Sequence, residues 1–327
     1  MFKKILFFCV ILSSILSCKK EKIRKTYTKI ITAPGPEDIV LDKVNNRMLV
    51  SCDERRDGFP ARGEIQQISL LSDTSIGLPL INLPAIPFHP HGFDLQNVNG
   101  VDYLYVINHY RDVANTNSVL QFEIRPESLM FIKEFKHPLL ISPNDLTVLP
   151  NGSFYFSNDR NSPDITELLT NPKAGSVVFC DGNTSWKKVD SAIAFPNGLY
   201  QENNKLYLAT SRNFALFTYD IQPDGSLKNR KTLSSINGMD NLISNGDELI
   251  VAVHPDEVKF ALLSYLPNEL SPCKTFSINK STGAANIIFS DDGSLISGSS
   301  TAIVSGKDLY LSQVFDGFVL KIANYAD

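Results

Sequence analysis

Short polar clusters recur along this chain, and their side chains are the ones best suited to chemistry. Five of them follow a proline or methionine: Pro36-Glu37-Asp38, Pro90-His91-Gly92, Pro143-Asn144-Asp145, Pro196-Asn197-Gly198 and Met239-Asp240-Asn241. Most of their side chains end in carboxylate or amide oxygens, and calcium binds about six to eight such oxygens in flexible geometry. Zinc prefers His or Cys, and magnesium keeps more of its water. The clusters therefore predict a calcium site if the fold brings them together.

A second explanation stays open at this point. Asn and Asp also occur in turns for purely local reasons, because their side chains hydrogen-bond the nearby backbone. Any one cluster is explained by a turn, whereas recurrence at similar positions favours a shared site. The segment 283–286 (Gly-Ala-Ala-Asn) is predicted as a weaker sixth cluster.

Two histidines are candidate acid–base residues. His91 lies in the second cluster, and His109 ends the apolar run 104–108 of the same repeat. A lone histidine is usually structural, but a pair can share a proton, with one imidazole activating water and the other relaying the proton. No GxSxG motif is present, so a serine nucleophile is not indicated.

The clusters are spaced by roughly 45 to 55 residues, which is the repeat length of propeller blades. Each repeat contains an apolar run typical of a strand, over 47–51, 103–108, 153–157, 205–210, 248–253 and 308–313. A partner run often follows, over 64–70, 118–124, 176–180, 214–221, 261–266 and 317–322. These repeats predict an all-β, six-bladed β-propeller over 34–327. The innermost strands would line a central channel, and the clusters would meet at its mouth.

The composition and net charge of the chain argue against nucleic acid as a partner. The chain has 327 residues, 43% of them hydrophobic, and a formal net charge of −4. The basic residues form no block beyond 19–25, so nucleic acid is not expected as a partner. The expected partner is a small molecule, and the sequence does not predict an oligomeric state.

The first residues predict export. Lys3 and Lys4 precede an apolar run over 5–12, and small residues lead to Cys18. The segment 15–18 (Ile-Leu-Ser-Cys) resembles a bacterial lipobox, which implies a signal peptide over 1–17, lipid on the Cys18 thiol and a polar tether over 18–33. The expected location is the bacterial cell envelope, with the membrane contacted through the lipid alone. The alternative is an ordinary signal peptide with an incidental cysteine.

Three cysteines remain beyond the signal. Cys52, Cys180 and Cys273 lie far apart in or beside apolar runs, without CxxC spacing. Each is expected to behave as a small buried hydrophobe, and one disulfide among them is possible.

Ordered motifs make the chain similar to the paraoxonase/arylesterase family of calcium-dependent lactonases. The motifs span most of 34–327 and are GPED (35–38), FHPHGFD (88–94), YVINH (105–109), SPNDL (142–146), SND (157–159), FPNG (195–198), MDN (239–241), VHP (253–255) and GSSTAIVSGKDLYLSQVF (298–315). The resemblance implies a calcium-dependent hydrolase of esters and lactones with two calcium ions.

The resemblance also implies a role for individual residues. The catalytic calcium would be held by Glu37, Asn144, Asn197, Asp240 and Asn241. A structural calcium would be held by Asp38, Asp145 and the backbone carbonyl of Phe93. His91 and His109 match the catalytic pair, and Phe59 and Phe195 match aromatic residues near the substrate. Asp240 is an alternative to His91 as the base.

The chain departs from the family pattern at two places. No cysteine lies near the ends of the predicted propeller, so the ring must close by hydrogen bonding and packing, with residues 26–32 completing a terminal blade. Arg160, beside Asp159, stands where the family often has histidine, which bears on substrate preference.

Three rival functions remain. They are a sugar-lactone hydrolase of gluconolactonase type, a strictosidine-synthase-like propeller, and a non-catalytic calcium-stabilised propeller that acts as a surface binding module.

Overall fold

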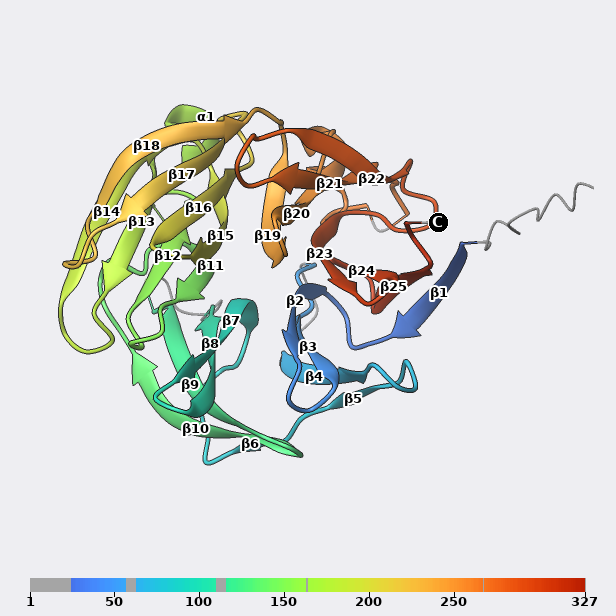
Figure 1. Ribbon diagram of the computed structural model, residues 1–327, viewed down its shortest axis with the longest axis horizontal. Helices are drawn as coiled ribbons and strands as arrows, with labels where there is room; N and C mark the ends of the chain where they lie inside the picture. The colour runs from blue at the N-terminus through green and yellow to red at the C-terminus, as the bar shows by residue number, and fades with distance from the viewer. Residues whose placement is uncertain (1–24, 57–62, 110–115, 163, 267, 327) are drawn as a thin grey trace, which may run out of the picture.

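Six sheets surround a central axis in the computed structural model, which describes residues 25–56, 63–109, 116–162, 164–266 and 268–326. Their strands pair antiparallel, apart from the short parallel pairing of β6 with β10. The strands nearest the axis are β2, β7, β11, β15, β19 and β23 (Figure 1). The predicted six-bladed β-propeller is confirmed.

The first three blades follow one another along the chain. From the axis outward, blade 1 consists of β2 (Pro36–Asp42), β3 (Arg47–Cys52), β4 (Glu64–Ser69) and β5 (Ser75–Gly77). Blade 2 consists of β7 (Pro90–Val98), β8 (Val101–Asn108), β9 (Ser118–Arg125), β10 (Ser128–Phe135) and the short edge strand β6 (Leu80–Ile81). Blade 3 consists of β11 (Pro143–Val148), β12 (Phe154–Asn158), β13 (Gly175–Cys180) and β14 (Trp186–Ile193).

The other three blades repeat this order. Blade 4 consists of β15 (Pro196–Glu202), β16 (Lys205–Thr210), β17 (Leu216–Ile221) and β18 (Leu227–Ser234). Blade 5 consists of β19 (Met239–Asn245), β20 (Glu248–Val253), β21 (Cys273–Asn279) and β22 (Ala285–Asp291). Blade 6 consists of β23 (Ser299–Ser305), β24 (Asp308–Gln313), β25 (Phe318–Ala323) and β1 (Thr26–Ile31).

A register irregularity lies at the start of every innermost strand. In each of the six, the pairing with the second strand shifts within the first four residues, as between Pro143 and Leu146 in β11. A bulge of this kind bends a strand and redirects its side chains. The polar clusters occupy these irregular positions, so their side chains are turned toward the channel mouth.

Blade 6 closes the ring. Strand β1 pairs antiparallel with β25 over its whole length, from Thr26↔Ala323 to Ile31↔Phe318. The predicted start of the propeller at residue 34 is therefore wrong by eight residues, because the segment assigned to the tether supplies the outermost strand of the last blade. The prediction that residues 26–32 complete a terminal blade is confirmed for Thr26–Ile31.

The prediction that residues 283–286 form the sixth polar cluster is wrong. Residues 283–286 lead into β22, the outermost strand of blade 5, and the innermost strand of blade 6 begins at Ser299. Its cluster is Ser299-Ser300-Thr301, which carries hydroxyls instead of carboxylates or amides. A search for Asp and Asn does not find such a cluster.

The predicted strand over 261–266 is also wrong. A short helix, α2 (Glu257–Leu262), stands there, and the third strand of blade 5 begins only at Cys273. The Asp256 side chain accepts a hydrogen bond from the Lys259 backbone N–H at 3.0 Å and caps the helix. This cap favours a helix where the apolar residues alone suggest a strand.

The core lies between neighbouring blades. Phe154 of blade 3, for example, packs between Phe135 of blade 2 and Trp186, at ring-centroid distances of 5.2 and 5.7 Å. The thiols of Cys52, Cys180 and Cys273 are buried and free, so the open question of a disulfide among them is answered in the negative. Burial raises the pKa of both Cys180 and Cys273 to about 12, which keeps these thiols protonated.

Several predictions fall outside the described residues. The signal peptide, Cys18 and Phe59 lie in the ranges 1–24 and 57–62, so the lipid anchor and the role of Phe59 stay predictions. Among the residues that are described, no helix has the length and apolar character needed to cross a membrane.

Adjacent isoleucines of β1 test the ring closure. Ile30 is 3% exposed in the core, whereas Ile31 is 71% exposed. We expect Ile30→Ala to lower the free energy of unfolding by about 2–4 kcal/mol, because it leaves a cavity between blades. Ile31→Ala is the matched control and should change it by less than about 0.5 kcal/mol. Urea unfolding checks both, and equal effects would contradict the docking of β1.

Candidate active site

The polar clusters and both short helices lie at the same end of the channel. The innermost strands begin there, and the antiparallel second strands of each blade end there. The helices α1 (Glu167–Thr170) and α2 follow the second strands of blades 3 and 5, so they stand at the rim of this mouth.

A cavity of about 340 Å³ opens at the mouth and is called the mouth cavity below. Its polar lining includes Glu37, Asn144, Asn197 and Asp240. Asn241 adjoins them, since its Nδ2 donates to Glu37 Oε1 at 3.1 Å. The structure thus brings together all five side chains predicted for the catalytic calcium, from blades 1, 3, 4 and 5.

Four oxygen atoms of this group are buried without a hydrogen-bond donor: Glu37 Oε2, Asn144 Oδ1, Asn197 Oδ1 and Asn241 Oδ1. A buried acceptor that lacks a partner costs about 1–3 kcal/mol, and native proteins contain few of them. Four such atoms at one channel mouth are available to coordinate a cation together.

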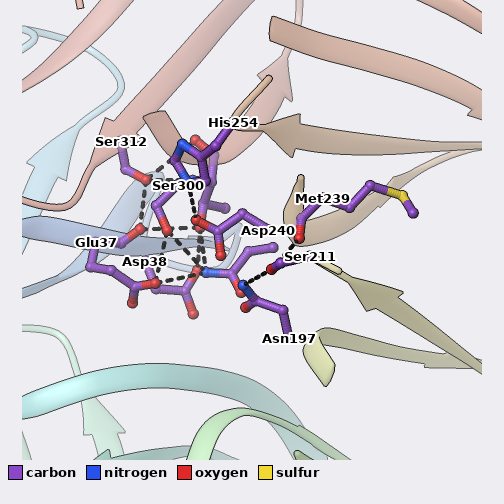
Figure 2. A network of polar contacts seen from close by, with 11 residues as sticks. Glu37, Asp38, Asn197, Ser211, Met239, Asp240, His254, Ser300 and Ser312 are labelled. Atoms are coloured by element: carbon purple, nitrogen blue, oxygen red, sulfur yellow. Dashed lines mark hydrogen bonds and ion pairs between the residues drawn. The ribbon is translucent and has the colours of Figure 1, made fainter. Parts of the chain in front are cut away.

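Neighbouring groups hold these oxygens in place (Figure 2). Ser300 Oγ donates to Glu37 Oε1 at 2.8 Å, so Oε2 is the oxygen left over. Asn197 Nδ2 donates to Ser211 Oγ at 3.1 Å, and Asn241 Nδ2 donates to Glu37. Because the amide nitrogens are engaged, the Oδ1 atoms are the ends that remain available.

The donor set fits calcium. Glu37 and Asp240 bring two negative charges, and the three asparagines add neutral oxygens. Calcium accepts such mixed oxygen ligands. Within the described ranges, no three His, Cys, Asp or Glu side chains are arranged to hold a metal ion, so the fit depends on the amide oxygens.

The residues predicted for the structural calcium are also close together. Burial, followed by repulsion from Glu37, raises the pKa of Asp38 well above its usual range. Burial and the charge of Asp38 raise the pKa of Asp145 likewise. The contact that the structure shows for Phe93 is its backbone N–H donating to Asp38 Oδ2 at 3.0 Å. The carbonyl of Phe93 as a ligand stays a prediction.

The two predicted catalytic histidines meet face to face. The rings of His91 and His109 are stacked with centroids 4.6 Å apart and planes inclined by 20°. The in-plane nitrogens of stacked rings do not point at the facing ring, and His109 Nε2 lies 2.6 Å from the Pro143 carbonyl oxygen. The structure brings the pair together, while the proton relay between them stays a prediction.

Arg55 fixes the protonation pattern of His91. Its Nη2 lies 3.1 Å from His91 Nδ1 and its Nε 3.4 Å from the same atom. A guanidinium can only donate, so Nδ1 must accept and a neutral His91 carries its proton on Nε2. In this state His91 is a hydrogen-bond donor on its other side.

His254 was missed as a site residue, although the motif VHP contains it. Its Nε2 lies 2.7 Å from Asp240 Oδ2, its ring stacks on Phe260 at 3.8 Å, and the side chain is buried. Gly238 lets the two strands approach, since a Cβ there would lie 1.9 Å from the His254 carbonyl oxygen. His254 orients the Asp240 carboxylate. Asp240 lies in β19 and His254 directly follows β20, and the sequence alone gives no sign that the two side chains meet.

Apolar side chains lie between charged ones in the remaining wall of the mouth cavity, where Asp159, Arg160, Arg212 and Glu257 also stand. Phe195, predicted near the substrate, lines it together with Ile165, Leu168, Phe260 and Phe315. A site with hard oxygens at its floor and apolar walls suits a ligand with one polar reacting group and an apolar body.

Comparison with known proteins agrees with this geometry. The family model described as Arylesterase matches residues 80–325, which is most of the chain. The chain belongs to the arylesterase family. Members of this family are hydrolases of esters and lactones that act on small molecules, so the predicted family and enzyme class are confirmed at that level.

Individual relatives are distant. Serum paraoxonase/arylesterase 2 of Homo sapiens is 28% identical over 242 residues, which cover 70% of this chain and 67% of that protein. Serum paraoxonase/lactonase 3 of Homo sapiens is 25% identical over 241 residues, with the same coverage. Among solved structures, a putative gluconolactonase has a TM-score of 0.57 at 13% identity, covering 91% of this chain and 92% of that chain. This last likeness supports the propeller fold of the chain.

The four oxygens without donors lead to a test by thermal unfolding. We expect calcium to raise Tm by several degrees at saturation, because a ligand that binds only the folded state stabilises it. Glu37→Gln should remove most of that shift. The matched control is Asp42→Asn at the far end of β2, where the carboxylate pairs with Arg47 at 2.7 Å. This control should lower Tm itself but leave the calcium-induced shift intact. A second calcium at Asp38 and Asp145 would leave part of the shift in place, so a calcium shift of undiminished size in Glu37→Gln is the result that would contradict the Glu37 site.

Proposed function

We propose that this member of the arylesterase family is a calcium-dependent hydrolase of carboxylic esters and lactones. The observation that carries the proposal is the group of four buried oxygens without donors at the floor of a cavity with apolar walls. Glu37, Asn144, Asn197, Asp240 and Asn241 would hold the ion. Asp38 and Asp145 would hold a second one.

Calcium, when bound, supplies positive charge that polarises a substrate carbonyl and stabilises negative charge on its oxygen. The protein's own groups orient the donors and exclude water. Ser300 and Ser211 fix the Glu37 carboxylate and the Asn197 amide, and the apolar side chains of the cavity wall lower the local dielectric. Such preorganised groups need no rearrangement as charge develops.

Two residues are candidates for the base that activates water. In the observed state, neutral His91 already carries a proton on Nε2, so it can accept a second proton only at Nδ1, the atom that Arg55 occupies and must first release. Asp240 requires no such change, because His254 already holds one of its carboxylate oxygens. The geometry therefore favours Asp240 as the base and gives His91 the role of a hydrogen-bond donor.

A substrate panel separates this function from its rivals. We expect turnover of aryl esters and aliphatic lactones that is lost on chelation and restored by calcium. Sugar lactones should be poorer substrates than aliphatic lactones, since Ile165, Leu168, Phe260 and Phe315 give part of the cavity an apolar surface. Preference for sugar lactones would favour the gluconolactonase type, and no hydrolysis of any substrate with calcium present would favour a binding module.

The role of His91 can be measured separately. If His91 donates a hydrogen bond, His91→Gln should lower kcat by about tenfold or less, since the loss of one such bond is modest. The calcium-induced shift in Tm should be unchanged, because His91 is not a predicted ligand. A loss of about 10²–10⁴-fold, typical of removing an acid or base, would return the base role to His91.

A further inference from the structure

Two arginines occupy equivalent positions at the rim of the mouth cavity. Arg160 and Arg212 each stand two residues beyond the second strand of their blade, β12 and β16, and both line the cavity. The strand register places each beside the start of its innermost strand, where Asn144 and Asn197 lie.

Arg212 is engaged in holding the rim together. Its Nε donates to Glu257 Oε2 at 2.8 Å on α2, and its Nη1 donates to the Leu168 carbonyl at 3.3 Å on α1. Its guanidinium also lies over the Phe195 ring, 5.5 Å from the centroid. These contacts make Arg212 a structural tie between the two helices.

Not all hydrogen-bond donors of the Arg160 side chain are used. Its Nη1 contacts both carboxylate oxygens of Asp159, at 3.0 and 3.1 Å. Its Nε is buried and has no hydrogen-bond partner among the described residues, and the side chain is 18% exposed. The guanidinium therefore faces a shared cavity with only part of its fork in use.

This arrangement is incomplete without an anion. A guanidinium fork matches a carboxylate through two parallel hydrogen bonds, and an unused buried donor carries a desolvation cost. Asp159 compensates Arg160 only in part. Burial raises the pKa of Asp159 despite the opposing effect of Arg160.

The walls narrow the class of ligand further. Ile165, Leu168, Tyr265 and Phe315 give the cavity an apolar surface between its charged groups. We propose that the substrates of this enzyme carry a carboxylate on an apolar acyl chain, and that Arg160 binds this carboxylate while the ester or lactone carbonyl lies at the oxygen cluster. The inference rests on the proposed hydrolase function and names its substrate class.

Paired synthetic esters test the proposal. The probes are para-nitrophenyl monoesters of dicarboxylic acids from glutarate to suberate, each matched with the ester whose free carboxylate is replaced by a carboxamide. The wild-type enzyme with calcium should prefer the carboxylate member of at least one pair by about 10- to 100-fold in kcat/KM, the range expected for hydrogen bonds to a charged group.

Variants assign the preference to Arg160. Arg160→Gln should remove it, mainly through KM, while turnover of the carboxamide esters changes by less than about threefold. Arg160→Lys keeps the charge beside Asp159 but lacks the fork, so it should retain an intermediate preference and decides the matter if the Gln variant does not fold. Arg212→Gln should lower both members of a pair equally. Arg230→Gln, at an exposed ion pair with Asp190, is the surface control and should change neither.

The outcomes distinguish the two proposals. Hydrolysis of the carboxamide esters without any preference for a carboxylate in the wild-type enzyme would overturn the role of Arg160 and leave the hydrolase function standing. An equal loss for both members in Arg160→Gln and Arg160→Lys would likewise overturn it. Failure to hydrolyse any member of the panel would overturn the hydrolase function itself.

Discussion

Four acceptor oxygens without donors, buried at one end of a channel, are the constraint on which the rest of this structure depends. Burying any one of these oxygens without a donor costs free energy, and the costs of four add together where blades 1, 3, 4 and 5 meet. Hydroxyl and amide groups around them are arranged to hold the oxygens in position without neutralising them, as Ser300 does for Glu37. Such a group is suited to a cation, and on the function proposed above that cation would polarise one substrate carbonyl beside the apolar part of the cavity wall.

The propeller makes this convergence possible. Residues that are more than 200 positions apart, such as Glu37 and Asn241, come within 3.1 Å because each heads an innermost strand. The register irregularity at the start of each of those strands turns the cluster side chains toward the axis. Ring closure by β1 then fixes blade 6 against blade 1, and it is blade 6 that supplies Ser300 and Thr301 to Glu37 and Asp38.

Much of this could be predicted from sequence, because repetition is visible there. The recurrence of polar clusters at blade spacing predicted six blades and a shared site of oxygen donors, and the family resemblance singled out the five side chains. The hydroxyl cluster at Ser299 was missed because serine and threonine carry no distinctive signal in an apolar repeat. The helix α2 was mistaken for a strand because its N-cap Asp256 lies outside the apolar run. The contacts of His254 with Asp240 and of Arg55 with His91 join side chains from different strands or blades, and no local pattern encodes such pairs.

The most direct measurement of the central claim is anomalous diffraction from crystals grown with calcium. The account predicts a strong peak within about 2.3–2.6 Å of Glu37 Oε2 and of the Oδ1 atoms of Asn144, Asn197 and Asn241, with Asp240 completing the set. A calcium-soaked crystal without a peak at this position, in which these oxygens accept hydrogen bonds from protein groups or water, would contradict it.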